Sequence, residues 1–199
     1  MRLTLNPPID LHRSWCGCGV GGGARRRYNA GMTAHTLTEL NLGGYRTSVT
    51  MTEFASVFDP LTSPGGDSSR SCNIVVYDEN TATIPLPHNE RGPRFVVPAG
   101  ERAKQRDVLF ALLDRFAEEH LTRGSCVAAV GGGAITDLVA FAASVYLRGI
   151  DVVLVPTSLL AMVDAAIGGK TGIDYGGYKN VVGTFYPARE VRICPDLLH

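Results

Sequence analysis

Three turns, each placed where a strand or helix is expected to end, hold the residues of this sequence that could do chemistry. The first is Gly131-Gly132-Gly133, which follows the apolar run 126–130. Glycines have no Cβ, so backbone N–H groups there could approach a pyrophosphate closely, and a following helix would add its positive N-terminal end. The pattern is not the GxGxxG fingerprint, because Thr136 occupies the third glycine position. This turn alone leaves dinucleotide binding and a plain flexible turn equally open.

Two further turns strengthen the binding hypothesis. Thr157 and Ser158 follow the apolar run 151–155 after Pro156, with hydroxyls at positions that cap a helix. Farther along, the segment 168–172 (GGKTG) combines three glycines with one lysine, which makes a backbone-rich anion site with a mobile cation. Lys179 and Asn180 add a second cation and an amide. The alternative is a glycine-rich surface loop with solvated lysines. Three such turns at successive element ends favour a binding site.

The elements that must position these turns are short buried strands alternating with helices. The runs 126–130 and 151–155 are rich in valine and alanine, as buried parallel strands are. A helix between them, expected to start at Thr136 or Asp137 and end at Arg148-Gly149, is long enough for a parallel crossover. Upstream, the sequence predicts strands over 45–51, 73–77 and 94–97, a short helix over 52–58, and an amphipathic helix from Val108 through Phe116 that ends near 122–124.

These elements predict an α/β fold of the Rossmann-like class, with a mostly parallel sheet and helices on both faces. The expected order is strand, helix, strand, strand, helix, strand, helix, strand, helix. Residues 37–199 are expected to form this domain. Residues 1–36 are predicted to be a disordered or non-native extension, because that stretch has no periodicity.

Composition places the chain among ordinary soluble globular proteins. It has 199 residues, 45% of them hydrophobic, and a formal net charge of zero, so neither nucleic acid nor a membrane is indicated as a partner. No apolar run approaches the roughly 20 residues that span a bilayer. The five cysteines are odd in number and scattered, which fits a reducing cytoplasm. Cys126 and Cys194 lie in apolar, strand-like settings and are expected to be buried packing residues.

The ordered motifs from Gly131 to Asn180 closely resemble the 3-dehydroquinate synthase family, within the sugar-phosphate cyclases. The matching blocks are GGG at 131–133, Asp137, YLRG at 146–149, VPTSLL at 155–160, VDAAIGGKTG at 163–172 and KN at 179–180. The departures from the family pattern are mild, and they are Ser158, Ala165-Ala166, Asp174 and Thr136. Of these, Thr136 could crowd a phosphate oxygen of the cofactor or donate a hydrogen bond to it.

The resemblance implies an NAD-dependent carbon–oxygen lyase that acts on a phosphate. The family cyclises 3-deoxy-D-arabino-heptulosonate 7-phosphate to 3-dehydroquinate with release of phosphate, in the shikimate pathway of aromatic amino acid biosynthesis. The residues implied to contact NAD are Asp78, Asn80, Glu101, Lys104, Gly132, Gly133, Ala134, Ile135, Thr136, Asp137, Thr157, Ser158, Lys170 and Lys179. Those implied to act on the substrate are Arg148, Asp164, Lys170 and Asn180.

Each of these roles has a structural alternative. Asp78 and Asn80 could simply form an exposed turn, and Glu101 and Lys104 could be first-turn helix charges. Arg148 could cap carbonyls at a helix end. Asp164 is favoured as functional if it is buried, because a buried, unpaired carboxylate without a role would cost several kcal/mol, roughly.

The resemblance also implies parts that this chain does not supply. In the family a divalent metal, zinc or cobalt, is held by a glutamate and two histidines of a C-terminal helical domain that would follow His199. None of the five histidines here pairs with another at ligand spacing, so no metal site is expected. We therefore expect this chain alone to bind NAD weakly at best and to be inactive, while the full-length family is expected to be homodimeric.

Three other functions remain open at this point. The chain could be a non-catalytic NAD-binding remnant, or another sugar-phosphate cyclase with a different small-molecule sugar phosphate as substrate. It could also be related to the metal-dependent glycerol and alcohol dehydrogenases, which share the GGG turn but not the 168–172 block.

Overall fold

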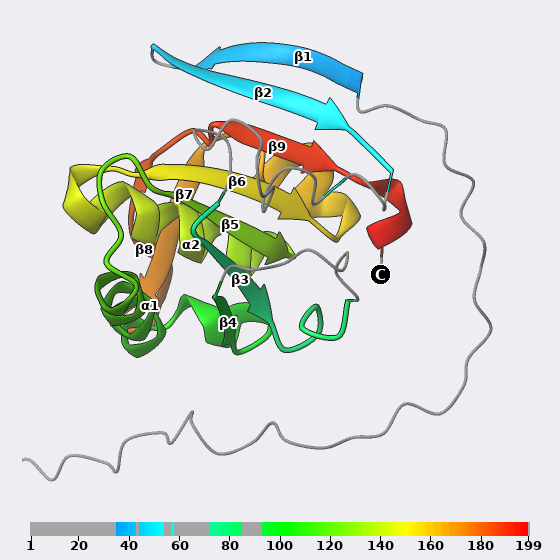
Figure 1. The fold of residues 1–199 in the computed structure, drawn as a ribbon. Coiled ribbons are helices and arrows are strands. Elements are labelled where there is room, and N and C mark those ends of the chain that lie inside the picture. The colour runs from blue at the N-terminus through cyan, green and yellow to red at the C-terminus, as the bar shows by residue number, and fades with distance from the viewer. Residues whose placement is uncertain (1–34, 43, 54–56, 58–71, 85–92, 199) are drawn as a thin grey trace, which may run out of the picture.

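A seven-stranded sheet forms the centre of the molecule in the computed structural model, which describes residues 35–42, 44–53, 57, 72–84 and 93–198 (Figure 1). The strand order is β1-β2-β9-β6-β5-β3-β4. The pair β1–β2 is antiparallel, and every other pair in this sheet is parallel. The predicted class, a mostly parallel α/β sheet, is confirmed.

The bounds of the elements follow the predicted strands closely. In chain order the elements are β1 (His35–Leu42), β2 (Tyr45–Met51), β3 (Ile74–Asp78), β4 (Arg94–Val97), the 3-10 helix η1 (Gly100–Lys104), α1 (Arg106–Glu118), β5 (Cys126–Gly131), α2 (Gly133–Val145), the 3-10 turn η2 (Tyr146–Arg148), β6 (Asp151–Pro156), the π-helical turn η3 (Ala161–Ala165), β7 (Lys170–Tyr175), β8 (Tyr178–Phe185), β9 (Glu190–Ile193) and the 3-10 turn η4 (Pro195–Leu197). The five predicted strands are confirmed to within one residue at each end.

Two predictions about the N-terminal half fall wholly or partly outside the described residues. Most of the predicted helix over 52–58 and all of residues 1–34 are in this category. However, β1 begins at His35, so the regular structure starts inside the segment 1–36 that was predicted to be disordered or non-native. The antiparallel pairing with β2 explains the difference, because the strand is fixed by a neighbour rather than by its own periodicity.

The two central strands are apolar on both faces, which places them in the middle of the sheet. All six residues of β5 are buried, and so are all residues of β6 after Asp151. Parallel strands covered on both sides need such continuous apolar runs. Full burial of a valine side chain stabilises a fold by roughly 1.5–3 kcal/mol, so β5 and β6 anchor everything that follows them.

Both α-helices of the described residues pack on one face of the sheet. Leu112 of α1 and Leu138 of α2 share a core cluster with Val127 of β5. The opposite face carries a second cluster, which includes Val130 and is covered in part by Leu197 of η4. In the described residues, Val57 and Ile84 also join this second cluster from outside the sheet.

The helix α2 is enclosed between two layers. Eight of its thirteen residues are buried, which is unusual for a helix with only one covered face. The sheet packs on one side of α2, and the antiparallel hairpin β7–β8 packs against α2 as well (Figure 1). The predicted order of elements did not include this hairpin, β1 or β9. At 168–172 the sequence predicted a glycine-rich loop, where β7 now begins. No helix within the described ranges is both long and apolar enough to cross a membrane.

Candidate functional site

The carboxyl ends of β3, β5 and β6 meet at one edge of the sheet and surround a pocket of about 510 Å³. Ligands of open α/β sheets bind at such edges. We call it the strand-end pocket. Its lining includes ten residues that were predicted to contact a dinucleotide, namely Asp78, Asn80, Glu101, Lys104, Gly132, Gly133, Ala134, Asp137, Thr157 and Ser158. Segments 80 residues apart in sequence thus converge on a single cavity.

The glycine turn after β5 has two distinct parts. At Gly131, φ is 157°, and a Cβ would overlap Ile135 and lie 2.9 Å from Oδ2 of Asp78. At Gly132, by contrast, the atom nearest to an added Cβ would be Oγ of Ser158, at 3.7 Å. Gly131 is therefore required by the packing of the fold itself. Gly132 borders open space, and only an occupant of the pocket would need that space.

The helix α2 starts earlier than predicted, and this changes the position of two residues. Its first residue is Gly133, with Gly132 as the N-cap, instead of Thr136 or Asp137. Thr136 consequently lies inside the helix, is buried, and donates its hydroxyl to the Gly133 carbonyl at 2.9 Å. Ile135 is buried as well. Neither is among the residues that line the strand-end pocket, so the predicted phosphate contact of Thr136 is not supported by its position.

Asp78 is held rigidly at the end of β3. Its Oδ1 accepts hydrogen bonds from the backbone N–H of Asn80 at 3.0 Å, from that of Thr81 at 2.8 Å and from the Thr81 hydroxyl at 2.9 Å. The exposed-turn alternative fails for Asp78, which is only 6% exposed, but it describes Asn80, which is exposed in the turn that follows β3. With Oδ1 occupied, a ligand hydroxyl would have to reach Oδ2, the oxygen that faces Gly131.

Lys104 carries a buried cation that links three elements. Its Nζ lies 2.5 Å from Oδ2 of Asp137 on α2 and 2.7 Å from Oδ1 of Asn180 on β8, and its side chain is 5% exposed. It ends η1, so it is not the first-turn helix charge that was considered. Burial raises the pKa of Asp137, and the hydrogen bond and charge of Lys104 partly offset that increase.

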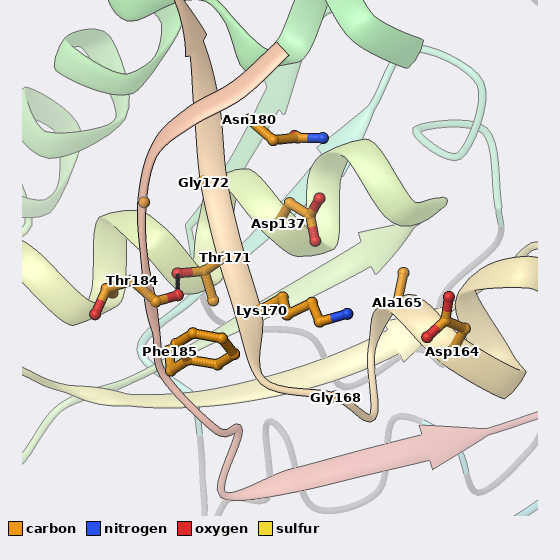
Figure 2. Close-up of a pocket in the computed structure, with 11 residues that line it drawn as sticks. Asp137, Asp164, Ala165, Gly168, Lys170, Thr171, Gly172, Asn180, Thr184 and Phe185 are labelled. Atoms are coloured by element: carbon orange, nitrogen blue, oxygen red, sulfur yellow. Dashed lines mark hydrogen bonds between the residues drawn. The ribbon is translucent and has the colours of Figure 1, made fainter.

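A second pocket of about 430 Å³ adjoins the first and lies between α2, η3 and the hairpin. We call it the hairpin pocket. Three of the residues predicted to act on the substrate line it: Asp164, Lys170 and Asn180. Figure 2 shows the Lys170 side chain directed toward Asp164 and Ala165. Asp137 and Ala165 line both pockets, so the two cavities share a wall.

Asp164 does not meet the condition under which burial would argue for function. It is exposed in η3, so no desolvation cost requires a compensating role. Its position beside Lys170 in the hairpin pocket is what keeps it a candidate.

The hairpin β7–β8, which sequence reasoning missed, positions Asn180, which the sequence had already singled out. Asn180 has a left-handed backbone with φ of 53°, and its N–H donates to Oδ1 of Asp174 across the hairpin at 2.8 Å. One signal could have revealed the hairpin: Gly176-Gly177, a two-residue connection of the type that tight β-hairpins prefer. Asp174, which was noted only as a departure from the family pattern, thus fixes the backbone of a site residue.

Besides Ile135 and Thr136, two more predicted residues lie outside both pockets. Lys179 is exposed and pairs with Glu101, with 3.3 Å between Nζ and Oε2. Arg148 is exposed at the end of η2, beyond the C-terminal end of α2. Because α2 has thirteen residues at about 1.5 Å each, roughly 20 Å separates Arg148 from the glycine turn. The structure therefore does not bring Arg148 to the cavities of its own chain.

The donor groups needed for a metal centre are not assembled in the described part of the chain. Within it, no three or more histidine, cysteine, aspartate or glutamate side chains gather to form a metal-binding group. No chemical step through a metal is therefore assigned to these residues.

Comparison with known proteins gives a consistent picture. The family model for the N-terminal part of 3-dehydroquinate synthase matches residues 94–199. The 3-dehydroquinate synthase of Methylacidiphilum infernorum is 48% identical over 157 residues, which are 73% of this chain and 44% of that protein. Other curated 3-dehydroquinate synthases are matched over 27% to 35% of their length, so the chain spans less than half of these relatives.

Two solved structures share the fold. A 2-deoxy-scyllo-inosose synthase complexed with carbaglucose-6-phosphate, NAD⁺ and Co²⁺ has a TM-score of 0.65 at 22% identity, over 81% of this chain and 46% of that one. The 2-epi-5-epi-valiolone synthase ValA from Streptomyces hygroscopicus, with NAD⁺ and Zn²⁺ bound, has a TM-score of 0.64 at 28% identity, again over 81% of this chain and 46% of that one.

Proposed function

Because this chain belongs to the 3-dehydroquinate synthase family, we propose that its strand-end pocket binds NAD and that its hairpin pocket holds a sugar phosphate against the cofactor. The observation that carries this proposal is the open cradle at Gly132. There the N-terminus of α2 faces a cavity that an added Cβ would begin to fill. The first N–H groups of a helix have no intrahelical partners, so they can bind the pyrophosphate.

The other residues of the strand-end pocket fit the rest of NAD. Asp78 offers Oδ2 to a ribose hydroxyl, and Thr157 and Ser158 offer hydroxyls at the opposite side of the glycine turn. Lys104 holds Asp137 in place, so that the wall shared with the hairpin pocket is rigid. Bound NAD would supply reversible hydride acceptance from a substrate hydroxyl.

In the hairpin pocket the chain supplies charge and orientation. Lys170 would stabilise the negative charge of the phosphate, and Asn180 would orient its oxygens through the amide that Lys104 fixes. Asp164 would accept a hydrogen bond from a substrate hydroxyl. We propose the family reaction for the whole enzyme, a lyase of aromatic amino acid biosynthesis. It forms 3-dehydroquinate and phosphate from 3-deoxy-D-arabino-heptulosonate 7-phosphate.

The variant Gly132→Ala tests the cofactor site. We expect calorimetric titration of the 199-residue chain with NAD to show saturable binding, and Gly132→Ala to weaken it by at least about tenfold, because the methyl group takes the place of a phosphate oxygen. The unfolding free energy should change by less than about 1 kcal/mol, since Gly132 has φ of −75° and no atom within 3.7 Å of the new methyl.

A matched control is Gly124→Ala, which lies outside the pocket and has no atom within 4 Å of an added Cβ. It should leave NAD affinity unchanged. If the chain binds no NAD, or if Gly132→Ala binds it as tightly as the unmodified chain, the proposed cofactor site is wrong.

A further inference from the structure

Two buried thiols face each other at the end of the sheet opposite the pockets. The Sγ atoms of Cys72 and Cys126 are 3.0 Å apart, and the two residues are 5% and 2% exposed. Cys126 is the first residue of β5, and Cys72 lies just before β3. Neither residue takes part in the proposed function, because the cavities lie at the carboxyl ends of these strands.

The backbone places the two cysteines within reach of a covalent bond, offset by one residue along adjacent strands. The strands β3 and β5 are adjacent and parallel, with Ile74 opposite Val127. Next to this pair, the N–H of Asn73 donates to the Cys126 carbonyl at 2.7 Å, and the Asn73 side chain accepts from the Cys126 N–H at 2.9 Å. Adjacent strands are about 4.8 Å apart and rise about 3.3 Å per residue, so a pair offset by one residue has a Cα separation of roughly 6 Å, within the roughly 4.4–6.8 Å that a disulfide spans. The sulfurs need to approach by only about 1 Å to reach bonding distance.

We propose that Cys72 and Cys126 are an oxidation site that closes to an intramolecular disulfide when the protein meets a small-molecule disulfide such as oxidised glutathione. One cysteine, as its thiolate, attacks a glutathione sulfur and releases the first glutathione thiolate. The second cysteine then attacks the protein sulfur of this mixed disulfide and releases the second glutathione. Two protein thiols are oxidised, one glutathione disulfide is reduced, and the two thiol protons pass to the two glutathione thiolates.

The surroundings of the two cysteines determine the rate of this reaction. The hydrogen bond between the two thiols and burial raise the pKa of Cys72 well above its usual range, whereas the charges of Arg189 and Arg192 oppose that rise. Thiolate is therefore scarce at neutral pH, and the dithiol form is stable between encounters with an oxidant. Closure is expected over hours in a glutathione buffer rather than within seconds.

The disulfide would staple the two strands that carry the glycine turn and Asp78. The cysteines are 54 residues apart, so the bond would close a long loop and restrict the unfolded chain. The melting temperature should rise by roughly 5–15 °C, as expected for a long-loop disulfide in a chain of this size. NAD affinity should not change, because Cys126 and Gly131 lie at opposite ends of β5, about 16 Å apart.

The test incubates the full chain in a glutathione redox buffer, followed by alkylation in denaturant and peptide mass spectrometry. We expect a cross-link between the tryptic peptides that hold Cys72 and Cys126, together with the rise in melting temperature. Cys194→Ser is the matched control, because Cys194 is buried in the same cluster but is outside the proposed pair. It should keep both effects, while Cys72→Ala and Cys126→Ala should lose both.

Two results would overturn the proposal. In the first, Cys72 and Cys126 of the folded chain both remain fully open to alkylation after incubation with oxidised glutathione. The incubation lasts as long as a denatured sample of the same chain needs to form disulfides. The other is a cross-link between different cysteines with Cys72 and Cys126 still reduced. If one alanine variant fails to fold, the other alanine variant decides the outcome.

Discussion

Replacing Gly131 with alanine is expected to lower the unfolding free energy by about 3 kcal/mol. The new methyl group would overlap Ile135 and lie 2.9 Å from Oδ2 of Asp78. Neither side chain can move aside, because Ile135 is 1% and Asp78 is 6% exposed. Forcing an extra carbon into such packing costs roughly 1–3 kcal/mol, and the unfavourable φ of 157° adds to that cost.

Urea unfolding followed by circular dichroism measures this loss. The Gly124→Ala variant is the control, and its midpoint should remain close to that of the unmodified chain. An unchanged midpoint for Gly131→Ala would contradict this prediction, because it would mean that the turn between β3, β5 and α2 makes room for the methyl group at no cost in stability. The contrast with Gly132→Ala separates the glycine that the fold needs from the one that the ligand needs.

Replacing Lys104 with methionine is the second large effect that we expect. It removes the cation that pairs with Asp137 and the donor that Asn180 accepts from. Leaving one charge of a buried pair without its partner costs roughly 3–5 kcal/mol, and Asp137 keeps some solvent contact, so we expect about 2–3 kcal/mol at pH 7. Adding Asp137→Asn should recover part of this loss, because no unpaired charge then remains.

The Lys104→Met loss should shrink as the pH falls from 7 toward 4. Burial already raises the pKa of Asp137 from its ordinary value of 3.8, and without Lys104 it rises further. A carboxyl whose folded-state pKa is raised favours folding when protonated, and that contribution disappears as the pH rises through the folded-state pKa.

Urea unfolding at several pH values measures this dependence, with Lys179→Met as the control. Its ion pair with Glu101 is exposed on both sides and should be worth less than about 1 kcal/mol. Equal losses for Lys104→Met and Lys179→Met would contradict the assignment of Lys104 as a buried link.

The sequence predicted the part of the site that depends on local pattern. The apolar runs of β5 and β6 can only be buried strands, and parallel strands necessarily place the glycine turn and Thr157 at the same edge. The hairpin was harder to predict, because all eight residues of β8 are exposed and show no alternation of polar and apolar residues. Its only local mark is the Gly176-Gly177 turn.

Other features depend on contacts that no local pattern contains. The role of Lys104 arises from partners 33 and 76 residues away in sequence. The start of α2 was placed too late because the Thr136 hydroxyl, which looked like a cap, bonds back to its own helix instead. Arg148 matches a family motif, yet its distance from the pockets became visible only when the length of α2 was known.

Because Asp137 is a wall of both cavities, a ligand that moves its carboxylate in one cavity also changes the shape and charge of the other. Any molecule in the strand-end pocket that shifts this carboxylate also shifts Lys104 and, through it, Asn180. Linkage then requires that each occupant alters the affinity for the other by the same factor. The salt bridge thus transmits occupancy of one cavity to the affinity of the other, with the same coupling free energy whichever ligand binds first.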